Sequence, residues 1–474
     1  MQEQNFDFLY IGVGGTGARV IESLVWLSFI GYFRREREVK FLLIDQDREN
    51  GNLIRAQETI KLYNELREKV NITNKERFAF FVTKFEDIYP RKSPFVPLSE
   101  GTFRDIISNE RKKYEKLINF LYTNEQLNFD LKEGFRGLPA IGTLSVGKEI
   151  ENNYQSIFGN INNNSRICIC GSVFGGTGAS ILPILPGIIK RKEQGKEIKI
   201  MNIMVLPYFK VREGLEDKIS PTGSSFPFKS VLAFDYHAYL NKKNFEGFEG
   251  ADYACAIGLP DIFQMDSDEI EYSLGGSSQE NPAHFIEALT IIFAKHLVDG
   301  FDEKIEEKSL YLIGLIEDNQ HYIYNLYEDD KKEIRDLILR LDSGLLASVI
   351  ISHFIEEDKN KNKKLLGKLF KEFEKYEPNV LTFAQSYIKY YFSVRYSLLS
   401  KSRRKYKGQM DDYQKKALEE IKKVLGKRFE HYLSNAYSKS ETILDTYENL
   451  IKNIYGEIQK DNKIRQCLEK VERG

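Results

Sequence analysis

The sequence predicts an α/β protein in which a largely parallel sheet is covered by helices and is followed by a small β-hairpin region and a helical C-terminal domain. Short apolar runs such as Arg166–Cys170 and Ile198–Leu206 are typical of strands buried on both faces. Between residues 6 and 298 these runs alternate with helix-like segments, and glycine-rich turns join several of them. This alternation indicates a parallel sheet with helices on both faces.

The first unit of the pattern is a strand, a glycine loop, a helix and a second strand. Phe6–Ile11 is the first strand, Ala18–Ile30 the helix and Val39–Ile44 the second strand. The loop, Gly12–Gly17, matches the dinucleotide fingerprint G-x-G-x-x-G. The second strand ends in Asp45–Asp47, and a carboxylate there commonly binds a ribose hydroxyl or faces a metal. The unit therefore predicts a nucleotide site.

This unit alone leaves the class of nucleotide protein open. The fingerprint fits an NAD-dependent oxidoreductase, whose cofactor site needs only the first glycine loop. Asp45–Asp47 followed by Asn52 and Leu53 also resembles the site of E1-like adenylating enzymes.

Residues 55–135 are predicted to be an insertion on the rim of the sheet. The charge pattern suggests helices around Ala56–Val70 and Ser108–Leu121. Pro90, Pro94 and Pro97 argue against regular structure between them.

A second glycine-punctuated stretch, Gly137–Gly147, precedes a helix-like segment, Lys148–Ile157. Its place just before the central strand suggests another loop on the phosphate side, with Gly142 in it. The alternative is a plain loop.

The central motif is Gly171–Ser180, which reads GSVFGGTGAS. It lies between the strand Arg166–Cys170 and a helix-like segment, Ile181–Ile189. Glycines let the backbone approach a ligand closely. A helix start offers free N–H groups and roughly half a positive charge, which favours phosphate. The GGTG of this motif repeats that of Gly14–Gly17, so we expect both loops to hold one nucleotide at the carboxyl edge of the sheet.

The rest of the first 300 residues continues the alternation. Residues 210–228 are expected to form a loop, Phe228–Leu240 a helix and Tyr253–Gly258 a buried strand. Asn281 and Pro282 are predicted to cap and open a long apolar helix over Ala283–Val298, which is the central helix of a region spanning 278–300. The nucleotide-binding domain is therefore expected to span residues 1–300.

Beyond residue 300 the pattern changes twice. Ser309–Ile316 and His321–Leu326 predict a hairpin within a linking region, 301–330. In residues 331–474, apolar side chains recur at helical spacing amid many charges, as at Ile334, Leu337 and Leu341. This predicts a helical C-terminal domain, whose charged faces are either simply solvated or contact partner proteins.

Composition limits the function classes. The net charge of −1 gives no basic field that would favour nucleic acid. The 4 cysteines form no CxxC pair, which suggests reduced thiols of a cytoplasmic protein. The N-terminus lacks a signal pattern, and no apolar run reaches the ~20 residues needed to span a membrane.

The ordered set of loops resembles the tubulin/FtsZ superfamily, and most closely its divergent prokaryotic tubulin-like members. The resemblance covers roughly residues 6–300. Ile11–Gly17 is similar to the first loop of FtsZ, Asp45–Asp47 to the acid of the second loop, and Gly137–Gly147 to the third loop. Phe174–Gly178 is similar to the signature GGGTG(S/T)G, and Leu206–Phe209 to the ending of the fifth strand. The resemblance implies a Rossmann-like GTPase sheet.

The resemblance also implies roles for single residues. Contacts to the α- and β-phosphates are implied for four residues of the first loop: Gly14, Gly15, Thr16 and Gly17. Gly12 of the same loop is a further expected nucleotide-binding residue. Contacts to the β- and γ-phosphates are implied for the signature: Gly175, Gly176, Thr177 and Gly178. Asp45 and Gly142 complete the expected phosphate side, Asp47 is expected near the γ-phosphate and Mg²⁺, and Asn281 is the expected base-reading residue.

Two segments depart from the family pattern. Phe174 replaces the first glycine of the signature, and Ala179 and Ser180 replace its end. The family's catalytic Asn-x-Asp-x-x-Asp has no clear copy here. Asp299 and Asp302 have the right spacing without the asparagine, and they are the candidate catalytic residues.

The resemblance therefore implies a GTP-binding protein, and by extension a GTPase, that self-assembles into filaments with the nucleotide between subunits. GTP or GDP with Mg²⁺ is the expected ligand, and ATP is the alternative. A nucleotide-binding scaffold without hydrolysis, working with partner proteins, is the second hypothesis. An NAD-dependent or E1-like enzyme is the third.

Overall fold

The computed structural model describes most of the chain. The described residues are 7–33, 38–69, 81–90, 94–97, 101–110, 115–135, 138–159, 161–210, 231, 250–259, 265–266, 279–299, 310–318, 321–324, 328–357, 367–399, 404, 410–425, 429–437 and 443–460. Expected elements at 210–228 and Phe228–Leu240 lie almost wholly outside them.

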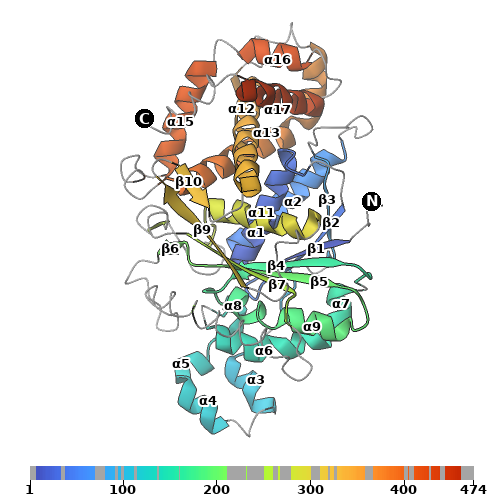
Figure 1. Ribbon diagram of the computed structural model, residues 1–474, viewed down its shortest axis with the longest axis vertical. Helices are drawn as coiled ribbons and strands as arrows, with labels where there is room; N and C mark the ends of the chain where they lie inside the picture. The colour runs from blue at the N-terminus through green and yellow to red at the C-terminus, as the bar shows by residue number, and fades with distance from the viewer. Residues whose placement is uncertain are drawn as a thin grey trace.

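The centre of the molecule is an eight-stranded sheet in the order β10-β9-β7-β5-β4-β1-β2-β3 (Figure 1). Its strands are β1 (Phe8–Val13), β2 (Glu38–Ile44), β3 (Lys84–Asp87), β4 (Arg166–Ser172), β5 (Lys199–Val205), β7 (Tyr253–Gly258), β9 (Leu310–Asp318) and β10 (His321–Tyr324). The first six are all parallel, with β9 parallel beside β7. Antiparallel β10 forms the predicted hairpin with β9 and ends the sheet. A separate pair joins β6 (Phe209–Lys210) to β8 (Met265–Asp266).

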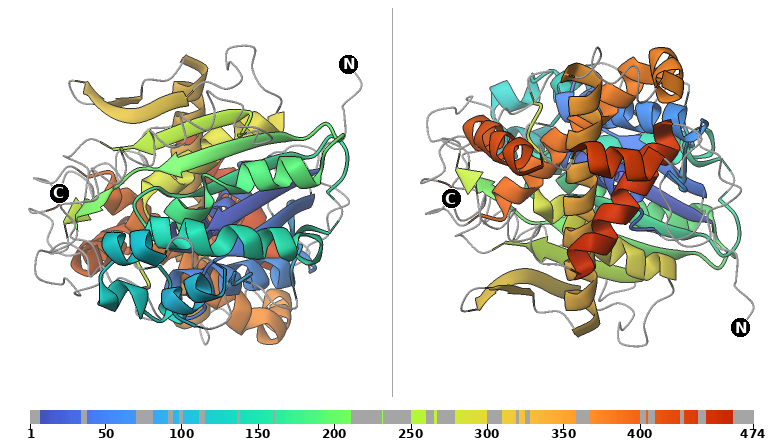
Figure 2. Two further views of the ribbon diagram at one scale, coloured as in Figure 1. Left: turned by 90° about the horizontal axis from the view of Figure 1, so that it is seen from below. Right: turned by 90° about the horizontal axis from the view of Figure 1, so that it is seen from above.

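Helices cover both faces of the sheet. Successive residues of a strand point to opposite faces, so the strands contribute side chains to two hydrophobic clusters, one on each face. One core cluster contains Tyr10 and Cys168 together with residues of α1 (Gly14–Phe29), α2 (Gly51–Arg67) and α11 (Phe285–Asp299). The other contains Ile11 and Ile169 with residues of the helices on the opposite face: α6 (Pro139–Asn152), α7 (Tyr154–Phe158), α8 (Thr177–Ile181) and α9 (Leu185–Lys192). Figure 2 shows the second set from below, in teal and green.

The C-terminal region is helical and packs on the α1 side of the sheet (Figures 1 and 2). Its helices are α12 (Glu328–Glu357), α13 (Gly367–Ser397), α15 (Met410–Leu425), α16 (Phe429–Tyr437) and α17 (Ile443–Lys460). Trp26 of α1 packs on Phe383, Tyr387 and Tyr390 of α13, with ring centroids 4.9, 5.6 and 5.7 Å apart. These helices therefore share one hydrophobic core with the sheet. The structure confirms the predicted α/β sheet followed by a helical region.

Three local expectations differ from the structure. The stretch predicted as an insertion, 55–135, supplies most of α2 and all of β3, and β3 pairs with β2 inside the sheet. Only its later part forms small peripheral helices: α3 (Phe103–Glu110), α4 (Glu115–Leu121), α5 (Asn124–Leu127) and the 3₁₀ turn Leu131–Glu133.

Of the expected glycine loop Gly137–Gly147, the residues from Pro139 onward instead form the start of helix α6, with Pro139 in its first turn. The central helix starts at Phe285, later than the predicted Ala283. Within the described residues, no helix is both long and apolar enough to cross a membrane.

Candidate nucleotide-binding site

The strand order places the two GGTG loops side by side. Val13, the last residue of β1, pairs with Ile44 of β2 on one side and with Gly171 of β4 on the other. All three strands are parallel, so the segments that follow them leave the sheet at the same edge. The chain order also reverses between β1 and β4, which is where open α/β sheets form a ligand crevice.

The first loop is held by close backbone contacts. A Cβ atom on Gly17 would lie 2.6 Å from the Gly12 carbonyl carbon and 2.7 Å from the Cys170 oxygen, so only glycine fits. Gly14 has a φ of +71°, a conformation that also favours glycine. Helix α1 starts at Gly14, and Gly15 and Thr16 remain partly exposed. The free N–H groups of this helix start therefore lie at the carboxyl edge of the sheet, where β1 meets β4.

The second loop contacts the first. A Cβ atom on Gly14 would lie 3.2 Å from the backbone nitrogen of Gly178. Gly175 and Gly176 remain partly exposed, as Gly15 and Thr16 do, whereas Thr177 is buried. The fold therefore brings together the eight residues of the two GGTG segments, which are about 160 positions apart in the sequence.

Asp45 ties the second strand to the second loop. Its Oδ1 accepts hydrogen bonds from the Thr177 hydroxyl at 2.8 Å and from the Asp47 N–H at 3.3 Å, and its Oδ2 accepts one from Asn50 Nδ2 at 3.2 Å. The side chain is 2% exposed. This burial raises the pKa of Asp45 to about 7, against the opposing effect of the Thr177 hydrogen bond. Since both carboxylate oxygens accept hydrogen bonds from the protein, Asp45 links the segment after β2 to the second GGTG loop.

Asp47 lies beside Asp45 at the same edge. Its Oδ1 accepts a hydrogen bond from the Glu49 N–H at 3.1 Å, and a Cβ atom on Gly134 would lie 3.4 Å from the Cβ of Asp47. Gln46 donates to the Leu131 carbonyl at 2.9 Å, so the 3₁₀ turn Leu131–Glu133 closes this side. A carboxylate oxygen suits Mg²⁺, which in nucleotide sites commonly takes one or two carboxylates together with phosphate oxygens. The donor type at Asp47 therefore fits the expected metal.

Two amide side chains that the sequence analysis did not select, Asn50 and Gln279, lie next to these loops, together with Asn52, which it named only for the E1-like alternative. Asn50 caps α2 through the Asn52 N–H at 3.0 Å and donates to Gln279 Oε1 at 2.8 Å. The Asn52 N–H also lies 2.9 Å from the Gln279 carbonyl. A Cβ atom on Gly15 would be 2.9 Å from Asn50 Nδ2. Asn50 could have been found as a helix cap, whereas Gln279 lies in a segment without any periodic signal.

Asn281 lies in the same segment, and its backbone is held on both sides. Its N–H donates to Asn52 Oδ1 at 2.8 Å, and its carbonyl accepts from Arg55 Nη1 at 2.7 Å. The side chain is 3% exposed, and its Oδ1 has no hydrogen-bond partner among the described residues. Asn281 does not cap the central helix as predicted, because that helix starts four residues later.

His284 and Glu287 cap α11 instead. The Ile286 N–H donates to His284 Nδ1 at 3.1 Å, and the His284 N–H donates to Glu287 Oε2 at 3.0 Å. Glu287 also pairs with Arg19 of α1 at 3.0 Å, with both side chains fully buried. Burial raises the pKa of Glu287 to about 7, against the attraction of Arg19. Burial, with Arg19 and Arg404 nearby, holds the pKa of His284 well below its usual value.

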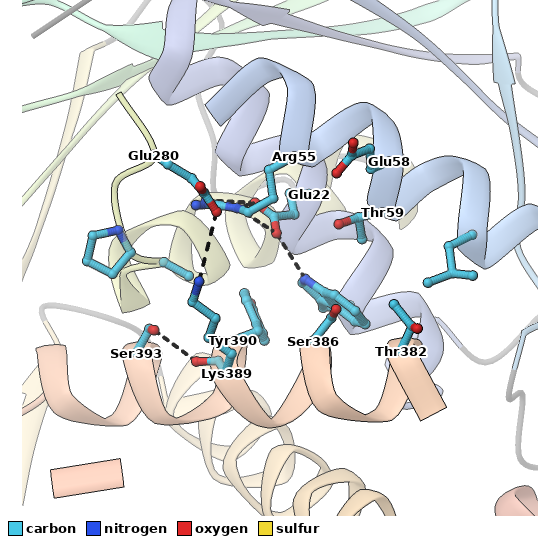
Figure 3. A pocket seen from close by; sticks show the side chains of 14 residues that line it. Glu22, Arg55, Glu58, Thr59, Glu280, Thr382, Ser386, Lys389, Tyr390 and Ser393 are labelled. Carbon is cyan, nitrogen blue, oxygen red and sulfur yellow. Dashed lines mark hydrogen bonds and ion pairs between the residues drawn. The ribbon is translucent and has the colours of Figure 1, made fainter. Parts of the chain in front are cut away.

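A cavity of about 240 Å³ lies between α1, α2, α13 and the segment before α11 (Figure 3). Arg55 and Glu22 face each other across its wall, with Arg55 Nε 2.9 Å from Glu22 Oε2. Glu280 and Lys389 form a longer ion pair of 3.9 Å at its exposed side. Trp26 also donates to Glu22 at 3.4 Å. These four ionic groups in the wall of the cavity are therefore paired with each other.

Three predicted site residues lie in other elements or outside the described chain. Gly142 is inside α6, where a Cβ atom would lie 2.6 Å from the Cβ of Ser180, so this glycine permits the close packing of α6 on α8. Asp299 is the last residue of α11, and its side chain is outside the described part. Asp302 is also outside it.

No protein-family model matches the chain, and no curated protein matches it significantly. The functional proposal therefore depends on the geometry of the site.

Proposed function

We propose that the protein binds a guanine nucleotide, GTP or GDP with Mg²⁺, at the edge of the sheet where its two GGTG loops meet, and that it self-associates in the manner of tubulin/FtsZ-like proteins. The observation that carries this proposal is the contact between Gly14 and Gly178 at the carboxyl edge of the sheet. Two phosphate-type loops in contact fit a chain of phosphates better than a single loop would.

The backbone supplies the phosphate contacts in this proposal. The first turn of α1 presents N–H groups and the positive end of a helix dipole, and the partly exposed Gly175 and Gly176 face the same crevice. Mg²⁺ held at Asp47 would neutralise part of the phosphate charge. The Oδ1 of Asn281 is buried and has no hydrogen-bond partner in the part of the chain that the structure describes, which makes that residue the candidate for reading donors on a purine base.

The second loop distinguishes this proposal from its alternatives. A dinucleotide-dependent oxidoreductase needs the first glycine loop alone. An E1-like enzyme would usually bring CxxC pairs for zinc, and the sequence has none. Partner binding through the C-terminal helices and hydrolysis at Asp299 and Asp302 stay predictions.

Nucleotide binding is tested with Gly176→Asp. An aspartate side chain at this loop position would clash with the phosphates, and its negative charge would repel them. Affinity for a fluorescent GTP analogue should therefore fall at least ~100-fold. Gly456→Ala in α17, where a Cβ atom meets nothing within 4 Å, is the control and should bind like the wild type. Equal binding by Gly176→Asp would remove the central claim.

Self-association is tested by sedimentation and by phosphate release across a protein concentration series. If neighbouring subunits complete each other's site, release per subunit should rise with concentration, and GTP should drive assembly. Tight GTP binding without turnover would favour the scaffold. Robust assembly of nucleotide-free protein would contradict a nucleotide interface.

A further inference from the structure

One buried amide, Asn50, connects the two GGTG loops. Its Nδ2 carries two hydrogens, one directed to Asp45 Oδ2 at 3.2 Å and one to Gln279 Oε1 at 2.8 Å. Its Oδ1 accepts the Asn52 N–H at 3.0 Å. The side chain is 3% exposed, and these three partners use both of its donor hydrogens and one acceptor position of its oxygen.

Each GGTG loop depends on this arrangement by a different route. The first loop is in direct contact, since a Cβ atom on Gly15 would be 2.9 Å from Asn50 Nδ2. The second loop is reached through Asp45, whose other oxygen accepts the Thr177 hydroxyl at 2.8 Å. Asn50 therefore fixes the carboxylate that holds the second loop while it packs on the first.

We infer that Asn50 is a positioning residue of the nucleotide site, an inference that depends on the proposed function. Its amide orients Asp45 and so sets the spacing of the two loops, without touching the phosphates itself. Gln279, on the segment leading to α11, is the third member of this network. The network therefore joins both phosphate loops to the segment that carries Asn281.

The capping role of Asn50 can be separated from this positioning role. Aspartate and serine cap helices about as well as asparagine does. Asn50→Asp keeps the cap but turns an acceptor toward Asp45 Oδ2 and Gln279 Oε1. We expect its affinity for a fluorescent GTP analogue to fall at least ~10-fold, because the donor to a buried carboxylate is lost.

The reciprocal exchange, Asp45→Asn with Asn50→Asp, restores the donor and acceptor pair at unchanged net charge. The amide introduced at position 45 can donate to the new carboxylate while its oxygen still accepts from Thr177, and Gln279 can turn its own amide to donate. Affinity should return to within ~3-fold of the wild type, as expected for a directly coupled pair. Asn153→Asp, at the exposed far end of α6, is the charge control and should bind like the wild type.

Thermal unfolding of each variant accompanies the binding titration. If Asn50→Asp fails to fold, Asn50→Ser replaces it, since serine keeps the cap and lacks the amide donors; it should also lose at least ~10-fold. Unchanged binding by a folded Asn50 variant, or no recovery on exchange, would overturn the positioning role. If the wild type itself binds no nucleotide, the proposed function fails first.

Discussion

The two GGTG loops have the same four residues, yet the protein supports them differently. The first passes directly from β1 into α1, a helix of 16 residues. The second is separated from β4 by Val173 and Phe174, and its Thr177 starts α8, a helix of 5 residues. Thr16 of the first is partly exposed, whereas Thr177 of the second is 6% exposed.

The supporting contacts also differ in part. Backbone packing holds both loops, since Gly17 lies directly against Gly12 and the Cys170 carbonyl, and a Cβ atom on Gly178 would lie 2.6 Å from the Ser172 carbonyl oxygen. Side-chain hydrogen bonds support the second loop as well, from Thr177 to Asp45 at 2.8 Å and from the Ser180 hydroxyl to the Gly176 carbonyl at 2.7 Å. A repeated motif can therefore keep one backbone arrangement while further side-chain interactions are added around one copy.

The largest expected effect is on the first loop. Gly17→Ala should lower the free energy of unfolding by ~3 kcal/mol or more, because the added methyl meets backbone atoms that cannot move aside. Denaturant titration followed by circular dichroism measures this. Gly456→Ala, in an open helical position of α17, should be neutral or stabilising by up to ~1 kcal/mol. A loss below ~0.5 kcal/mol for Gly17→Ala would show that the packing is looser than the structure indicates.

A smaller effect should separate the two threonines. Thr177→Val keeps the side-chain shape but removes the donor to buried Asp45, which should cost ~2 kcal/mol of unfolding free energy. Thr16→Val, at the matching but partly exposed position, should change it by no more than ~0.5 kcal/mol. Equal losses in denaturant titrations would remove the proposed difference between the loops.

The smallest effect concerns the support behind the first loop, where Arg19 of α1 pairs with Glu287 of α11. His284 caps α11 through Nδ1, and burial with Arg19 and Arg404 holds the pKa of His284 well below 6.5. Below about pH 6.5, His284 of the unfolded chain therefore binds a proton that His284 of the folded protein does not bind. Protonation favours the unfolded chain, so the free energy of unfolding decreases as the pH falls below about 6.5.

His284→Asn keeps a capping oxygen but does not titrate. Below pH ~6.5, the wild type should lose up to ~1.4 kcal/mol per pH unit more than this variant. Unfolding free energies of both proteins from pH 8 to pH 5 measure the difference, and the titration of Glu287 largely cancels between them. Parallel curves would mean that His284 binds its proton equally well in the folded and unfolded protein, which would contradict the expected effect.

The predicted strands were the most reliable part of the sequence analysis. Parallel strands buried on both faces must be apolar throughout, and β4, β5 and β7 follow directly from such runs. Charged and weakly patterned segments were less informative. Helix α2 buries only one side, with Leu53, Ile60 and Leu66 among its inward residues, so its many charges suggested an insertion.

The structural role of a glycine could not be predicted from the sequence either. A glycine in sequence indicates either a loop or close packing, and only the neighbours decide between them. Gly17 serves the loop geometry of the site, whereas Gly142 lets α6 approach Ser180 of α8. The sequence alone could not distinguish the two.

The α/β class, the helical C-terminal region and the two glycine loops could be predicted from the sequence, because they follow from apolar periodicity and from backbone freedom along short stretches. Which distant groups meet could be seen only in the folded molecule. Strand order and register determine the contact of Gly14 with Gly178. They also determine the hydrogen bonds that join Thr177 to Asp45, Asp45 to Asn50, and Asn50 to Gln279. Such contacts carry no periodic signal, since each is made by a single polar side chain or glycine whose partner lies far away in the chain.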